Sequence, residues 1–268
     1  MKTALTIAGS DSSGGAGIQA DIKTFQAHGV FGMSAVTAVT VQNTRGVFGV
    51  QDIRPDIVRD QILCLFDDIE VHALKIGMVP NAEVIEAVAD ALSRINRSPV
   101  ILDPVMVSTS GYDLMRQNAR DALIRCLFPL CDLVTPNLTE VETLTGKSVQ
   151  NVEQMKTAAW DILELGAPGV VIKGGHLTTD AVDVVCDGSQ LIELKSERVD
   201  TRNTHGTGCT FSAAIAANMA TGYDFFESIR RAKAYVTGAL KHAFPLGKGY
   251  GPTHHFYDVY ARAGMESS

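Results

Sequence analysis

Residues 204–210 (Thr-His-Gly-Thr-Gly-Cys-Thr) combine two glycines with a cysteine and run directly into an alanine-rich helical segment. Glycine lets the backbone turn tightly and bring its N–H groups close to a ligand. A helix start adds unpaired N–H groups and the positive end of the helix dipole, so this segment is suited to bind a phosphate. A thiol at such a helix start ionises more easily, which singles out Cys209. The alternative is a tight loop without a ligand, because neither the Walker motif nor the dinucleotide fingerprint is matched.

A second glycine-rich stretch, residues 9–17, follows the first expected strand and leads into a helix that carries Asp21. We expect Asp21 to face the mouth of a pocket and to accept hydrogen bonds from a ligand amine or hydroxyl. The alternative is a carboxylate on the helix surface. Gln42 ends the second expected strand, and its amide both donates and accepts, which suits the edge of a nitrogen heterocycle. The alternative is that Gln42 is an ordinary polar residue at the end of a strand.

Polar residues at further strand ends could bind phosphate and metal. Asp103 could hold Mg²⁺ directly or through water, or it could cap a turn. Asn137 and Glu140 lie on one face of a helix start, where they could steer a hydrated Mg²⁺, form a capping box, or do both. Lys173 precedes two glycines and suits a phosphate in transit; its alternative is a solvated surface lysine.

An alternation of strands and helices must position these residues. The expected strands are 4–8, 33–41, 72–76, 99–102, 131–134, 169–172, 181–186 and 190–195, and the expected helices are 16–28, 55–68, 81–96, 117–127, 137–145, 151–165, 207–221 and 225–242. This order predicts an α/β fold with a mostly parallel sheet covered by helices on both faces, and ligands at the C-terminal ends of the strands. Asn81 is expected to cap its helix, and 186–190 to join two antiparallel strands. We find no linker or repeat, so residues 1–268 are expected to form one domain.

Composition narrows the class of protein. The chain has 268 residues, of which 46% are hydrophobic and 20% charged, as in folded globular proteins. A net charge of −7 argues against a general nucleic-acid or anionic membrane surface, and no apolar run approaches the ~20 residues that span a bilayer. The five cysteines are odd in number and include no Cys-x-x-Cys pair, which fits a reducing compartment. We therefore expect a cytoplasmic protein with neither nucleic-acid nor membrane partners.

Taken together, the motifs resemble the hydroxymethylpyrimidine/phosphomethylpyrimidine kinases of thiamine biosynthesis, within the ribokinase-like superfamily. The segments that carry the resemblance are Ala8–Asp11, Gly14–Asp21, Val41–Thr44, Lys75–Met78, Leu102–Val105, Thr135–Glu140, Ile172–His176 and Thr204–Thr210. The resemblance implies a ribokinase-like three-layer α/β/α sandwich, ATP as cosubstrate, Mg²⁺, and a homodimer. It also implies two successive phosphoryl transfers, first to 4-amino-5-hydroxymethyl-2-methylpyrimidine and then to its monophosphate.

The resemblance further implies roles for individual residues. The residues that would line the pyrimidine pocket are Gly9, Asp21, Gln42, Met78 and Val105. Those that would bind the nucleotide and the metal are Asn137, Glu140 and Lys173. The catalytic anion hole would be formed by Gly206, Thr207, Gly208 and Cys209. We expect Asp103 to join the metal group and Lys173 to take part in catalysis. Residues 107–118, with Ser108, Ser110 and Gly111, are the segment expected to close over the site.

Cys209 leaves two questions open. Most ribokinase-like sugar kinases carry an aspartate base at this position, so Cys209 either removes a proton or only shapes the anion hole. Related pyridoxal kinases share the cysteine, which makes a pyridoxal or pyridoxine kinase the alternative enzyme; Gln42 favours the pyrimidine. A pyrimidine-binding sensor without catalysis is the non-enzymatic alternative, and the intact set of phosphate-binding residues argues against it.

Overall fold

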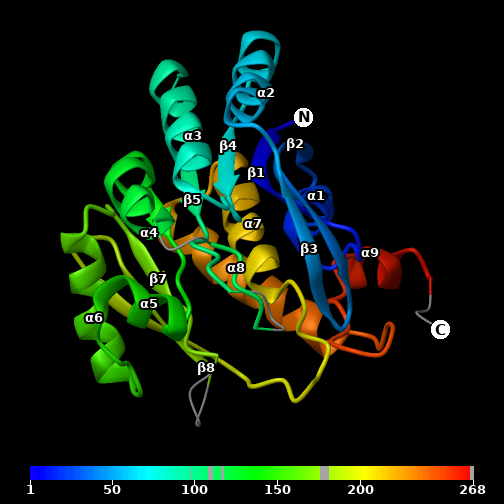
Figure 1. Ribbon diagram of the computed structural model, residues 1–268. Helices are drawn as coiled ribbons and strands as arrows, with labels where there is room; N and C mark the ends of the chain where they lie inside the picture. The colour runs from blue at the N-terminus through cyan, green and yellow to red at the C-terminus, as the bar shows by residue number, and fades with distance from the viewer. Residues whose placement is uncertain (97, 108–110, 116–117, 176–180, 266–268) are drawn as a thin grey trace.

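The computed structural model describes residues 1–96, 98–107, 111–115, 118–175 and 181–265 (Figure 1). Ser108 and Ser110 of the segment expected to close over the site lie outside these ranges, as does His176. Within the described part of the chain, no helix combines the length and the apolar character that a membrane span requires.

The described residues form a nine-stranded sheet in the order β3-β2-β1-β4-β5-β6-β7-β8-β9. The strands are β1 Thr3–Asp11, β2 Phe31–Asn43, β3 Gly46–Asp52, β4 Ala73–Ile76, β5 Val100–Leu102, β6 Leu133–Val134, β7 Val170–Ile172, β8 Ala181–Cys186 and β9 Leu191–Ser196. Strands β2, β1 and β4 to β7 pair in parallel, whereas β3, β8 and β9 pair antiparallel with their neighbours. The mostly parallel sheet is confirmed, and it brings the C-terminal ends of six strands to one edge.

Helices cover both faces of the sheet (Figure 1). They are α1 Gly17–Ala27, α2 Pro55–Asp68, α3 Ala82–Arg94, α4 Ala119–Ala122, α5 Leu138–Thr145, α6 Val152–Glu164, α7 Thr207–Ala220, α8 Phe225–Lys241 and α9 Tyr257–Arg262. Side chains of α2 to α6 form one buried apolar cluster, and side chains of α1, α7 and α8 form a second. Successive strand residues point to opposite faces: Leu74 joins the first cluster and Ala73 the second. The three-layer α/β/α sandwich is therefore confirmed.

Local sequence explains several element ends. Asn81 accepts the Val84 N–H at 2.9 Å and caps α3 as expected. The turn between Cys186 and Leu191 joins the antiparallel strands β8 and β9. Gly206 precedes α7 with a φ of +78°, and a Cβ there would overlap the carbonyl oxygen of Gly15. Only glycine fits this position without strain, so the two glycine-rich loops are packed together through backbone.

Three elements differ from the expectation. Strand β3 was missed because Val47 is its only buried residue, so it lacks the alternation of a half-buried strand. Helix α9 was missed because it is six residues long and buries none of them. The helix expected over 117–127 is an α-helix only over Ala119–Ala122 and continues as a π-helix, η1 Leu123–Leu127, before a 3-10 turn, η2 Phe128–Leu130. Apolar spacing does not distinguish these helix types over so few residues.

Candidate active site

The start of α7 lies against two side chains from other strand ends. A Cβ on Gly208 would sit 3.4 Å from Lys173 Nζ and 3.5 Å from Asp103 Oδ2. Lys173 Nζ in turn donates to Asp103 Oδ1 at 2.8 Å. The structure thus brings the glycine-rich helix start, the carboxylate after β5 and the lysine after β7 to one place. The side chain of Lys173 is only 17% exposed, so it is not a solvated surface lysine.

The backbone N–H groups at the start of α7 are not all equivalent. Thr207 N–H donates to the Thr204 carbonyl at 3.2 Å, and its hydroxyl donates to the same oxygen at 2.7 Å. Gly206, Gly208 and Cys209 lie at positions whose N–H groups have no partner within an α-helix. The Thr207 amide, expected in the anion hole, is therefore already engaged within the loop, whereas Gly206, Gly208 and Cys209 are the better placed donors.

Lys173 lies between two carboxylates, which shift its pKa and whose own pKa values it shifts. Burial lowers the pKa of Lys173, but Asp103 and Glu140 outweigh it and leave that pKa above its usual value. Burial opposes ionisation of Asp103, yet the charges of Lys173 and Lys75 hold the pKa of its carboxyl below the usual value. Burial raises the pKa of Glu140 to about 7, with Lys173 opposing the shift and Asp103 adding to it. The site therefore holds a cation between one firmly ionised carboxylate and one that titrates near neutral pH.

Asn137 and Glu140 form the expected capping box at the start of α5. Asn137 Oδ1 accepts the Glu140 N–H at 3.0 Å, and Glu140 Oε2 accepts the Asn137 N–H at 2.7 Å. The same Glu140 oxygen lies 3.9 Å from Lys173 Nζ. The expected capping box is therefore present, and the Glu140 carboxylate that takes part in it also faces Lys173.

Magnesium would have to be shared with a nucleotide. Within the described ranges, no group of three or more histidine, cysteine, aspartate or glutamate side chains lies close enough together to hold a metal ion. Mg²⁺ in kinase sites is held by one or two carboxylates together with waters and substrate phosphates. The two carboxylates of Asp103 and Glu140, both beside Lys173, fit that donor set.

Asp21 does not face an open pocket mouth, and this expectation was wrong. Its side chain is 0% exposed, because Asp21 lies in the second turn of α1 on the face that packs against the sheet. Oδ2 accepts from Thr6 Oγ1 at 2.6 Å and from Lys75 Nζ at 2.9 Å, while Oδ1 has no hydrogen-bond partner among the described residues. Burial raises the pKa of Asp21 despite the charge of Lys75. The sequence analysis missed Lys75 as the counter-ion, since it sits inside an apolar strand.

Cys209 is not an activated thiolate. Burial raises the pKa of its thiol to about 11; the carboxylates of Asp21 and Asp103 add to the rise, and Lys75 and a backbone hydrogen bond from Gly17 oppose it. The expected ease of ionisation at the helix start is therefore overturned by desolvation and two nearby negative charges. The thiol is protonated near neutral pH.

Apart from Asp21, the positions expected to contact the pyrimidine lie near or just after the ends of four strands. Gly9 in β1 and Met78 after β4 are packed together, because a Cβ on Gly9 would lie 2.9 Å from Met78 Sδ. Gln42 is the last but one residue of β2, and its amide lies 3.3 Å from His205 Nε2. Val105 follows β5 two residues after Asp103 and is partly exposed. This placement leaves the predicted contacts with a pyrimidine compatible with the fold.

Asp11 and His205 are polar residues of the site that the sequence analysis did not assign. The Asp11 carboxylate accepts the N–H groups of Ser13, Gly15 and Ala16 at 2.8, 3.1 and 2.8 Å, and His205 Nε2 lies 2.8 Å from Asp11 Oδ2. Burial raises the pKa of Asp11, but the hydrogen bond and charge of His205 together with Ser13 lower it overall. The signal was available in the sequence, because His205 directly precedes the glycine that opens α7.

Comparison with known proteins identifies the family. The family model described as phosphomethylpyrimidine kinase matches residues 11–254. The chain belongs to the phosphomethylpyrimidine kinase family. A hydroxymethylpyrimidine/phosphomethylpyrimidine kinase of Rhizobium meliloti is 50% identical over 258 residues, which cover 95% of this chain and 97% of the relative.

Two solved structures share the fold. The ADP complex of Bacillus subtilis pyridoxal kinase has a TM-score of 0.89 and 44% identity, and the match covers 96% of this chain and 98% of that one. The phosphomethylpyrimidine kinase of Clostridium difficile 630 has a TM-score of 0.81 and 45% identity, covering 90% and 100% respectively. Membership in this family confirms the expected phosphotransferase of thiamine pyrimidine metabolism, and pyridoxal kinases are its structural neighbours.

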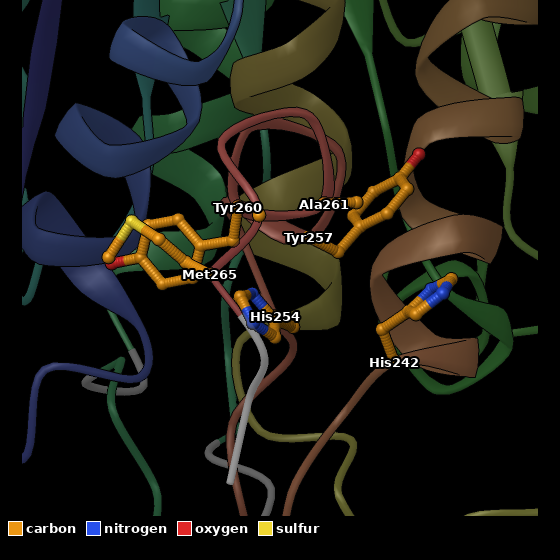
Figure 2. A pocket seen from close by; sticks show the side chains of 7 residues that line it. His242, His254, Tyr257, Tyr260, Ala261 and Met265 are labelled. Carbon is orange, nitrogen blue, oxygen red and sulfur yellow. The ribbon is translucent and has the colours of Figure 1, made fainter.

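A cavity of about 500 Å³ lies outside this kinase site (Figure 2). It is formed by the end of α8, the segment after it and α9, and its lining includes His242, His254, Tyr257, Tyr260 and Met265. His242 and Tyr257 stack with ring centroids 4.9 Å apart. None of the residues expected at the kinase site lines this cavity. The stacked rings of His242 and Tyr257 connect α9 to the end of α8 beside this cavity.

Proposed function

We propose that the chain transfers phosphoryl groups from ATP to 4-amino-5-hydroxymethyl-2-methylpyrimidine and then to its monophosphate, in the cytoplasm. The observation that carries this proposal is the convergence of the α7 start, Lys173 and Asp103 at the ends of the parallel strands. The relatives support the choice of substrate, since several carry the name hydroxymethylpyrimidine/phosphomethylpyrimidine kinase at 40% identity or more.

The pyrimidine would bind across the ends of β1, β2, β4 and β5. Gln42 would read the amine and ring nitrogen, and Gly9, Met78 and Val105 would form the apolar walls. Asp21 would act only indirectly, through its buried ion pair with Lys75; its other carboxylate oxygen has no hydrogen-bond partner among the described residues. In this arrangement the substrate hydroxymethyl group would point toward the start of α7.

Stabilisation of charge on the transferred phosphoryl group would come from the α7 start. The N–H groups of Gly206, Gly208 and Cys209 provide preorganised donors, and Lys173 would exchange its contact with Asp103 for phosphate oxygens. Asp103 and Glu140 would hold Mg²⁺, which neutralises the nucleotide phosphates. Phosphoryl transfer depends mainly on positioning and charge neutralisation. A neutral Cys209 thiol, with a pKa of about 11, therefore fits a role in shaping the anion hole better than a role as base.

Product analysis tests the proposal directly. The purified chain is incubated with MgATP and the pyrimidine alcohol, and the mono- and diphosphate products are resolved. We expect both products to appear in sequence. A parallel incubation with pyridoxal is needed, because Bacillus subtilis pyridoxal kinase is 44% identical and shares the fold. A higher kcat/KM for pyridoxal would reverse the choice of substrate, and no turnover of ATP with any pyrimidine alcohol would favour the sensor.

The exposed face of the β2–β3 hairpin supports a homodimer of single-domain subunits. Val39, Val41 and Phe48 are 46%, 65% and 62% exposed, and Val41 lies against Gly49 of the paired strand. A second copy of the chain would remove this apolar surface from water. Light scattering during size-exclusion chromatography should give twice the chain mass of 28.7 kDa; a monomer mass at micromolar concentration would contradict the assembly. One cooperative unfolding transition is expected for residues 1–268.

A further inference from the structure

His205 lies between the Asp11 carboxylate and the Gln42 amide. Its Nε2 is 2.8 Å from Asp11 Oδ2 and 3.3 Å from the terminal amide of Gln42. His205 and Asp11 are buried, whereas Gln42 is only half-buried. One ring nitrogen therefore touches two polar groups, one at the end of β1 and one near the end of β2.

Hydrogen-bond chemistry fixes the proton on this nitrogen. The Asp11 carboxylate can only accept, and it already accepts three backbone N–H groups. An unprotonated Nε2 would face Asp11 with two lone pairs opposed at 2.8 Å. Nε2 must therefore carry a proton and donate to Asp11, which also gives His205 a defined donor direction.

The donor on His205 determines which atom of the Gln42 amide faces it. In the structure the Gln42 amide nitrogen faces His205 Nε2 at 3.3 Å and its oxygen faces Thr40 Oγ1 at 3.0 Å. The two amide atoms are assigned from their hydrogen bonds, and two N–H groups that face each other repel, so the oxygen must face His205 and the nitrogen must face Thr40. Thr40 can accept from this nitrogen, because its hydroxyl donates its own hydrogen to the Ser10 carbonyl at 2.9 Å. A half-turn about the last side-chain bond of Gln42 removes the opposition of donors: the single Nε2–H of His205 is then shared between Asp11 Oδ2, at 2.8 Å, and the amide oxygen as its longer, weaker acceptor.

We propose that Asp11 and His205 are positioning residues that lock the Gln42 amide in one orientation and thereby select a 4-aminopyrimidine over its 4-oxo analogue. In this orientation the second lone pair of Oε1 can accept from an exocyclic amine, and the second hydrogen of Nε2 can donate to an unprotonated ring nitrogen. A 4-oxo ring presents the reverse pattern, an acceptor oxygen beside an N–H. A freely turning glutamine would read both rings, whereas a locked one rejects the oxo form. The inference rests on the proposed function.

The test compares kcat/KM for the 4-amino alcohol and for the 4-oxo alcohol in four proteins: wild type, His205→Leu, Gln42→Leu and the double variant. Loss of the lock should reduce the amino-to-oxo ratio by about tenfold, which corresponds to one hydrogen bond to a charged network. In the Gln42→Leu background, His205→Leu should change the ratio by less than about twofold, because the lock acts only through Gln42. His205→Gln, which keeps an N–H near the Nε2 position, should restore most of the ratio.

Other outcomes separate the possibilities. A purely structural role for His205 would lower kcat for both alcohols and raise KM for ATP with the ratio unchanged, and that result overturns the inference. His242→Leu, at the C-terminal end of α8, is the matched control and should leave the ratio unchanged. If the wild type phosphorylates neither pyrimidine, the proposed function fails and the inference with it.

A measurement on the wild-type protein is independent of whether the variants fold. ¹⁵N NMR of the histidine side chains should show His205 with a protonated Nε2 throughout the range in which the protein is folded and Asp11 is ionised. A neutral ring with its proton only on Nδ1 would overturn the lock, since the Gln42 amide nitrogen could then donate to it.

Discussion

Replacement of Gly208 by aspartate should slow phosphoryl transfer by roughly 10²–10³-fold while leaving the fold intact. The Cβ position at residue 208 is 3.4 Å from Lys173 Nζ and 3.5 Å from Asp103 Oδ2. The carboxylate of Gly208→Asp would therefore reach Lys173 and occupy the place where we expect the migrating phosphoryl group. It would also compete with that group for the N–H groups at the start of α7.

The expected loss of kcat can be worked out from the distance between the new carboxylate and the transferred phosphoryl group. A unit negative charge about 4 Å from the transferred phosphoryl group, at an effective dielectric constant of about 20, is repulsive by about 4 kcal/mol. Neutralisation of part of that charge by Lys173 reduces the effect to about 3–4 kcal/mol. A barrier raised by this amount corresponds to a loss of roughly 10²–10³-fold in kcat.

The assay is steady-state kinetics with MgATP and the pyrimidine alcohol, and Gly208→Ala is the matched control. A methyl group at 3.4 Å is in ordinary van der Waals contact, and alanine is favoured in a helix over glycine by about 1 kcal/mol. The alanine variant should keep kcat within about threefold of wild type. Circular dichroism melting monitors the fold of both variants.

A folded Gly208→Asp protein with a kcat within threefold of wild type would refute the reasoning. It would show that the reacting phosphoryl group lies elsewhere than at the α7 start. Equal large losses in the alanine and aspartate variants would instead attribute the effect to steric crowding, and the electrostatic argument would fail.

Three further predictions concern buried ionisable side chains. Cys209→Ser should lower kcat by less than about tenfold, because a thiol with a pKa of about 11 is not the base. Lys75→Met should destabilise the fold by about 3–5 kcal/mol in urea unfolding, since it leaves the Asp21 carboxylate buried without its partner, and adding Asp21→Asn should recover most of that loss. Glu140 has a pKa raised from 4.5 to about 7, so its contribution to stability is complete below about pH 4.5 and is lost as the pH rises through about 7; Glu140→Gln should remove up to about 3 kcal/mol of that pH dependence.

Each of these outcomes has a control or a contrary result. A kcat lowered a thousandfold or more by Cys209→Ser would restore Cys209 as the base. For the buried pair, Arg94→Met in the exposed pair with Asp90 should change the unfolding free energy by less than about 0.5 kcal/mol, and additive effects of the Lys75 and Asp21 changes would show that the pair is not coupled. A Glu140→Gln protein with the same stability slope between pH 5 and 8 as wild type would place the titration on another group.

The sequence alone determined the α/β class, most element positions and the family. Hydrophobic periodicity and caps such as Asn81 are local properties of the chain, so strands and helices could be predicted within a few residues. The grouping of Gly208, Lys173 and Asp103 could also be anticipated, because the ends of parallel strands must meet at one edge of the sheet. Strand β3 and helix α9 were missed because they bury too little surface to leave a pattern.

Only the tertiary structure decided the electrostatics of the site. Whether Asp21 faces a ligand or a buried lysine, and whether Cys209 ionises, depends on desolvation and on charges brought together from distant parts of the chain. Neither desolvation nor distance is encoded in the spacing of residues along a sequence. For the same reason the contact of His205 with Asp11 and Gln42, which are 194 and 163 residues away in the chain, was visible only once the fold had placed their loops side by side.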